Sequence, residues 1–192
     1  MTESITRELQ RDAAGNLKLH EALVAFDRTR SWAETQAAQG RVLALGRDIV
    51  PSVLAELGEP QPPERFDVLL ALLMKQQTAD ELIELARSGA AGWVLRAALA
   101  EALSHYAESL HDAAVKERIS SVLVQLSRDT EAGVRIAAVE AIGLSKLGAD
   151  PQVREVLRRV ASEDSNADVR REAKIVLDET DSRELDPKGL QE

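Results

Sequence analysis

A nine-residue segment of this chain returns, in recognisable form, thirty-five residues further on. The two copies occupy residues 127–135 and 162–170, and both end in Val-Arg. Each copy is followed, three residues later, by an alanine, Ala138 or Ala173. Self-similarity at a fixed period of this size is typical of repeat architectures, in which one unit cannot bury its apolar face without a neighbour. The sequence therefore predicts a stack of similar units.

The units are expected to consist of α-helices. Apolar residues make up 44% of the 192 residues but aromatic residues only 3%, so Ala, Leu and Val carry most of the apolar content. Small and aliphatic side chains suit close packing of helix on helix. Apolar positions also recur at steps of three and four residues almost throughout, which is the period of an amphipathic helix. We therefore expect an all-α fold.

Capping and turn signals divide the chain into helices. Ser31 is a candidate N-cap, Pro51 fits the first turn of a helix, and residues 58–63 form the clearest loop. Gly15 and its neighbours are expected to end a first helix, and Gly89 a later one. The expected helices are 3–12, 17–28, 31–46, 48 to the loop, 64–77, 78–88, 92–107, 111–128, 130–146, 150–162 and 167–180.

Over residues 90–180 the pattern resembles HEAT repeats. That family places an Asp before the first helix of each pair and follows it with Val-Arg-x-x-Ala-x-x-Ala-Leu. Before residue 90 the match is only to the helical rhythm. The two full copies are Asp129 with residues 134–142 and Asp164 with residues 169–177, and a third copy at 95–103 has Ala90 in place of the Asp.

The resemblance implies a right-handed α-α superhelix of about four to five antiparallel helix pairs, with the second helix of each pair lining the concave face. We expect N-terminal helices or a cap over residues 1–30 and HEAT-like repeats over 31–180. Residues 181–192 are polar and lack apolar periodicity, so they are expected to form an acidic, disordered tail.

The repeated Asp and Arg residues are expected to form a structural ladder between units. An Asp before a helix can cap it and can also face the Arg of the same or a neighbouring unit. The expected members are Asp129, Arg135, Asp164 and Arg170, with Arg135 and Asp164 partly buried between repeats.

Charge and composition exclude several kinds of function. The chain holds 24 Lys and Arg against 33 Asp and Glu, a net charge of −9, which disfavours binding to a nucleic-acid backbone. The absence of cysteine excludes disulfides and thiol catalysis. The N-terminus has no basic lead followed by an apolar stretch, and the longest apolar run, 68–74, is far shorter than the roughly 20 residues that cross a bilayer. A cytoplasmic location is therefore expected.

No arrangement of residues predicts catalysis or a bound metal. His20-Glu21 resembles the His-Glu pairs that ligate iron in the HEAT-like deoxyhypusine hydroxylases, but His105 and His111 do not repeat it. A first-row metal needs several convergent ligands. Phosphate-loop, zinc-protease and nucleophile-elbow motifs are also absent. We expect no enzyme activity, no cofactor and no metal.

The second helices carry the charges that would define a partner-binding surface. The 78–88 helix is mainly acidic and the 150–162 helix mainly basic. Of the large aromatic residues, Trp93 and Tyr106 are expected to pack in the core or at helix ends. The sequence does not indicate whether Trp32 is buried or exposed. The expected partner-binding residues are Asp80, Glu81, Glu84, Arg87, Lys116, Arg154 and Arg158.

Three classes of function remain. A protein-binding scaffold or adaptor is favoured, because solenoids present long curved surfaces and no catalytic constellation competes. Its partner would be an extended peptide or a helix in the concave groove. The later repeats are also similar to HEAT-like bacterial phycobilin lyases, which implies a ligand-sized pocket. The HEAT-like alkylpurine DNA glycosylases resemble this chain in helical repeats alone, and the acidic charge disfavours that alternative.

Overall fold

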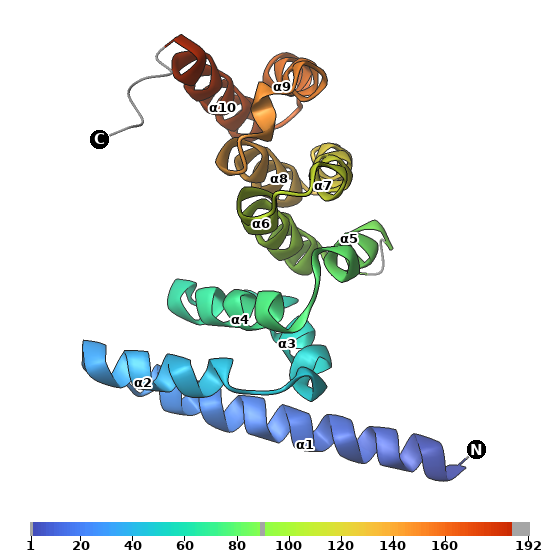
Figure 1. Cartoon of the computed structure of the whole chain (residues 1–192), viewed down its shortest axis with the longest axis vertical. Coiled ribbons are helices and arrows are strands. Elements are labelled where there is room, and N and C mark those ends of the chain that lie inside the picture. The colour runs from blue at the N-terminus through green and yellow to red at the C-terminus, as the bar shows by residue number, and fades with distance from the viewer. Residues whose placement is uncertain (1, 89–90, 186–192) are drawn as a thin grey trace. The chain divides into compact units, whose positions relative to one another are not determined.

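All regular secondary structure of the described residues is helical. The computed structural model describes residues 2–88 and 91–185. Over these residues it contains ten α-helices, two short 3-10 helices and no strand, which confirms the all-α prediction. The chain divides into two compact units, residues 1–78 and 79–192. Figure 1 shows the helices of each.

The first unit contains four α-helices. Helix α1 lies within residues 1–30, which were expected to form N-terminal helices or a cap, and it packs against α2, α3 and the short helix η1. The elements are α1 (Thr2–Asp27), α2 (Trp32–Leu43), η1 (Arg47–Ile49), α3 (Val50–Leu57) and α4 (Pro63–Gln76).

Helix α1 is continuous where the sequence predicted a break at Gly15, so that prediction is wrong. A Cβ atom at Gly15 would lie 3.2 Å from the backbone oxygen of Asp48. The glycine therefore allows η1 to approach closely. A glycine inside a helix costs only about 1 kcal/mol. Burial of Leu19, Leu23 and Phe26 along one face of α1 outweighs that cost.

Local signals place the other helix starts of the first unit. The Ser31 side chain accepts a hydrogen bond from the backbone N–H of Glu34 at 3.3 Å, so Ser31 is the N-cap of α2 as predicted. Pro51 lies in the first turn of α3 and Pro63 begins α4. A proline there loses no helical hydrogen bond, because the first N–H groups of a helix have no partner within it.

Individual side-chain contacts, which do not recur as a motif, join the helices of the first unit. Arg65 of α4 binds Asp27 of α1 at 3.2 Å and Glu56 of α3 at 2.8 Å. Farther along α4, the Lys75 ammonium donates to the backbone oxygen of Leu43 at 2.7 Å. These contacts fix α4 against the ends of three other helices.

The second unit forms two layers. Helices α6, α8 and α10 pack side by side in one layer, and α5, α7 and α9 form the other (Figure 1). The elements are α5 (Ala79–Arg87), α6 (Trp93–Ser109), α7 (Ala113–Leu126), α8 (Ala132–Leu144), η2 (Leu147–Ala149), α9 (Pro151–Glu163) and α10 (Ala167–Leu185).

Small residues allow close packing in the layer of α6, α8 and α10. Ala138 of α8 and Ala173 of α10, the alanines of the two sequence copies, are completely buried. A Cβ atom at Gly143 would lie 2.9 Å from Cγ2 of Val176, closer than real Cβ contacts. Helix α8 can therefore approach α10 only because position 143 has no side chain.

The ends of the later helices differ in detail from the expected ones. Helix α8 ends at Leu144, and Lys146 adopts a left-handed conformation with φ of 60° before η2 begins. Helix α10 continues to Leu185, so residues 181–185 of the expected tail are helical. The rest of that tail and the expected helix stop at Gly89 lie outside the described residues.

Candidate partner-binding groove

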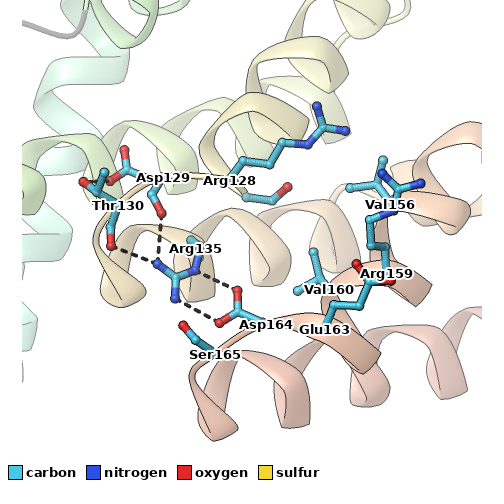
Figure 2. Close-up of a pocket in the computed structure, with 11 residues that line it drawn as sticks. Arg128, Asp129, Thr130, Arg135, Val156, Arg159, Val160, Glu163, Asp164 and Ser165 are labelled. Carbon is cyan, nitrogen blue, oxygen red and sulfur yellow. Dashed lines mark hydrogen bonds and ion pairs between the residues drawn. The ribbon is translucent and has the colours of Figure 1, made fainter.

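An ion pair joins consecutive repeats at the start of α8. Two parallel hydrogen bonds link the Arg135 guanidinium to the Asp164 carboxylate, from Nε to Oδ2 at 2.8 Å and from Nη2 to Oδ1 at 2.9 Å (Figure 2). Only 11% of the Arg135 side chain and 8% of the Asp164 side chain are exposed. Arg135 Nη1 also donates to the backbone oxygens of Asp129 and Thr130. The structure thus brings together two residues that the sequence assigned to the ladder.

The same geometry recurs one repeat earlier, with an arginine that sequence reasoning missed. Arg96 donates from Nε and Nη2 to the two carboxylate oxygens of Asp129, both at 2.8 Å. Its Nη1 donates to the backbone oxygen of Ala91 at 2.7 Å. Arg96 and Arg135 occupy the same position in the repeated motif, so the signal was present. We call Arg96–Asp129 and Arg135–Asp164 the Arg–Asp ladder.

The ladder lowers the pKa of both carboxyl groups. Hydrogen bonds from Arg96 are the largest cause of the lowered pKa of Asp129, and those from Arg135 have the same role for Asp164. Burial opposes each shift, because it disfavours a charged carboxylate. Both carboxylates also accept a backbone hydrogen bond two residues ahead, so each begins the turn into the next helix.

Arg170, the fourth predicted ladder residue, makes only part of this pattern. Its Nη1 donates to the backbone oxygen of Asp164 at 2.6 Å, but no carboxylate of the described residues binds it. On the same side of α10, Lys174 is exposed at the position where α8 carries the buried Val139. This side of α10 therefore presents a lysine where α8 has a buried valine.

A groove runs between the parallel helices α7 and α9. It consists of two cavities of about 400 and 990 Å³, and both are lined by Arg128 and Val156. Because they share these two residues, the cavities lie next to each other along the helices. The smaller cavity, shown in Figure 2, lies beside the Arg135–Asp164 pair. We call the whole depression the α7–α9 groove.

The α7–α9 groove has an apolar floor and edges that carry both cations and the exposed carboxylates of Glu117 and Glu163. Val124, Val153 and Val156 contribute apolar surface along its length. Arg128 and Arg159 line the smaller cavity, are exposed, and form no ion pair with the described residues. Arginines in this state can bind carboxylates or phosphates. The list of predicted partner-binding residues includes neither, although both lie on or just after the second helices that carry the predicted surface.

The predicted partner-binding residues lie on α5, α7 and α9. Of the seven, only Lys116 lines the groove. On α5, Asp80 binds Arg118 of α7 at 2.6 Å, and Glu84 lies 3.7 Å from Arg87. These charges therefore pair with one another across neighbouring helices. Glu81 of the same helix is half-buried.

The two predicted arginines of α9 also have partners within the chain. Arg154 is largely buried and lies 3.7 Å from Asp181 of α10, so it helps to join α9 to α10. Arg158 is exposed and lies 3.5 Å from Glu155 of its own helix. The predicted gradient from an acidic α5 to a basic α9 is thus weakened by local pairing.

The aromatic and histidine residues are placed at helix ends and on the surface. The ring of Trp93 lies against Gly133, where a Cβ atom would be 3.3 Å from it, while Trp32 is exposed. Tyr106 is half-buried, and burial raises the pKa of its hydroxyl. His20 is exposed. Within the described residues, no group of three or more His, Asp or Glu side chains is arranged to hold a metal ion.

None of the described helices is both long and apolar enough to span a bilayer.

Comparison with known proteins agrees with this architecture. Residues 79–178 match the family of HEAT repeats. No curated protein sequence matches the chain significantly. Among solved structures, it is similar to a chain of the complex of CpcE and CpcF of phycocyanin lyase from Nostoc sp. PCC7120. The identity is 18% and the TM-score 0.51, over 83% of this chain and 98% of that chain. The match over residues 79–178, together with the paired helices and the Arg–Asp ladder, shows that the chain belongs to the HEAT-repeat family.

Proposed function

We propose that this chain is a non-catalytic protein-binding scaffold whose α7–α9 groove takes an extended peptide or a helix of a partner protein. The observation that carries the proposal is the pair of adjacent cavities that share Arg128 and Val156. A long, shallow depression between two helices suits an elongated ligand.

The chemistry of the groove favours a partner with both apolar and charged side chains, because Glu117 and Glu163 line it together with the cations. The three valines of the floor offer apolar contact, and the partner's carboxylates would find Lys116, Arg128 and Arg159 along the edges. Charge-assisted hydrogen bonds to arginine are about twice as strong as neutral ones. The acids of the ladder do not compete for these cations, because Asp129 and Asp164 are already bound by other arginines.

The proposal is tested by blocking the groove. In Val156→Arg a long charged side chain replaces the residue shared by both cavities. Leu17→Arg makes the same kind of change at an exposed apolar position of α1, outside the groove. Affinity purification from the native host, followed by mass spectrometry, should recover a partner with the wild type and with Leu17→Arg but not with Val156→Arg. Circular dichroism checks that both variants are folded. Equal recovery with Val156→Arg, or no recovered protein at all, would contradict the proposal.

A second candidate is a module that handles a bilin pigment. It is supported by the similar fold of the phycocyanin lyase chain and by the larger cavity of about 990 Å³, which is large enough for a small organic ligand. Co-expression with a bilin tests it. A visible absorbance band that stays with the purified chain, and is lost in Val156→Arg, would favour this candidate over the scaffold. A colourless product would count against it.

A further inference from the structure

The layer of α6, α8 and α10, opposite the α7–α9 groove, exposes large apolar side chains. Trp93 of α6 is 50% exposed, Leu144 of α8 is 60% exposed and Ile175 of α10 is 42% exposed. Among the described residues, only Leu17 and Trp32 of the first unit are large apolar residues with comparable exposure. Three such residues on one layer are more informative than single ones, because scattered exposed apolar residues are normal on any protein.

These side chains belong to one continuous face. The Trp93 ring lies against Gly133, so the start of α6 meets the outer side of α8 there. From Gly133 the outer side of α8 continues through Glu140 to Leu144, in steps of seven and four residues that keep one helix face. Ile175 follows Glu172 on α10 by three residues, again on one face.

Carboxylates connect the apolar residues across the three helices. The pKa of Glu140 of α8 is raised, and burial of its carboxyl group is the largest cause. The nearby negative charges of Glu172 on α10 and Glu101 on α6 raise it further. Within the described residues no cation pairs with Glu140 or Glu172. This contrasts with α5 and α7, where Asp80 and Glu84 each lie beside Arg118.

The charge of the face selects the class of partner. Like charges on neighbouring helices cost free energy in the isolated chain, and a cation from a partner would remove that cost. Nucleic acids and anionic membrane surfaces would be repelled by the same carboxylates. A second copy of this chain, with its net charge of −9, is also a poor complement.

We propose that the outer face of α6, α8 and α10 is a second docking surface, which binds a cationic amphipathic helix of a partner protein. The apolar side of that helix would cover Trp93, Leu144 and Ile175. Its Lys or Arg side chains would flank that apolar side and contact Glu140 and Glu172. This surface is separate from the α7–α9 groove, so the chain would join two partners, one on each layer.

The proposal is tested with a defined probe, a synthetic amphipathic helix of Leu and Lys residues, added to the full-length ¹⁵N-labelled chain. A matched peptide with Glu in place of Lys is the control for charge. The expected result is saturable perturbation of amide signals along the outer sides of α6, α8 and α10 by the Lys peptide and none by the Glu peptide. Perturbation centred on α7 and α9, or binding of both peptides, would overturn the proposal.

Two substitutions that each remove one negative charge distinguish binding of the Lys peptide at this surface from its general electrostatic attraction to an acidic protein. Glu140→Gln removes a carboxylate of the proposed face, and Glu117→Gln removes an exposed carboxylate that lines the α7–α9 groove. Affinity for the Lys peptide should fall about threefold in Glu140→Gln, as for one exposed charge pair, and stay unchanged in Glu117→Gln. Leu144→Ser should weaken binding about tenfold or more without changing the net charge.

An equal loss in both Gln variants, or no loss in Leu144→Ser, would overturn the proposal. Sedimentation of the chain alone provides a further check. A dimer that dissociates in Leu144→Ser would mean that a second copy of the chain occupies the face. The Val156→Arg variant should bind the Lys peptide normally, so failure of this proposal and failure of the groove proposal can be distinguished.

Discussion

Ion pairs join neighbouring helices in both compact units, but their pattern differs between the two. In the second unit one motif, an arginine bound through two hydrogen bonds to the aspartate of the next repeat, occurs twice with nearly identical geometry. In the first unit a single arginine, Arg65, binds two acids from different helices. The repeated motif leaves a signature in the sequence, whereas the single contact leaves none. This is why the HEAT-repeat match covers residues 79–178.

The largest effect is expected from breaking the more buried pair of the ladder. Arg135→Ala should lower the free energy of unfolding by about 3 kcal/mol, because it leaves the Asp164 carboxylate without its partner in a largely buried site. Urea denaturation measures the change. Hydrogen exchange should show faster exchange in α8, α9 and α10 but not in α1 to α4. An unchanged denaturation midpoint would show that the ladder does not stabilise the fold.

Acid should remove the same interaction gradually. The folded-state pKa of Asp164 is lowered, so its contribution to stability is complete above the unfolded pKa of about 3.9 and is lost as the pH falls through the folded-state pKa. The destabilisation caused by Arg135→Ala should therefore be largest at neutral pH and shrink below about pH 4. Urea curves of both proteins across this range test it. A difference that is independent of pH would mean that lost packing of the arginine, and not its charge, causes the effect.

A smaller effect is expected in the first unit. Arg65 is 21% exposed, and one of its two partners, Asp27, is exposed as well, so water weakens the pairing. Arg65→Ala should lower the free energy of unfolding by about 1 kcal/mol, with faster hydrogen exchange confined to α1, α3 and α4. A loss as large as that of Arg135→Ala would remove the distinction between the two units.

The smallest effect should come from the surface pairs of α5 and α7. Arg118 is 40% exposed, and its partner Asp80 is even more accessible. Arg118→Ala should change the free energy of unfolding by less than about 0.5 kcal/mol, because exposed pairs gain little over their interactions with water. Thermal unfolding in low and high salt checks this. A marked, salt-dependent loss would mean that α5 and α7 depend on this pair.

The sequence predicted best where the structure repeats. The repeated Val-Arg and Asp positions predicted the helix pairs and the contact between Arg135 and Asp164. They could do so because each unit has the same geometry and therefore needs the same residues at the same positions. Arg96 occupies the same motif position as Arg135, but it was not predicted as a ladder residue. The reason is that its own repeat has Ala90 in place of the aspartate. The acid that Arg96 binds comes from the following unit.

Prediction was weaker where the contacts are between distant segments. Gly15 was interpreted as a helix end, although its role is to let the backbone at Asp48 approach α1, which no local pattern encodes. Arg154 was assigned to a binding surface because it is a charged residue of a second helix, but it turns toward Asp181 of α10. The α7–α9 groove depends on the spacing of two helices, and spacing of this kind has no counterpart in residue order.

The exposed Lys174 of α10 has a consequence for the packing of any further helix. On α8 the corresponding side is buried by the next helix, with Val139 at the contact, but on α10 that position is Lys174. Another molecule could add end-on there only by stripping water from an ammonium group, which costs several kcal/mol. Lysine at this one place therefore disfavours burial of this side of α10 under a further helix, and a valine there would remove that cost.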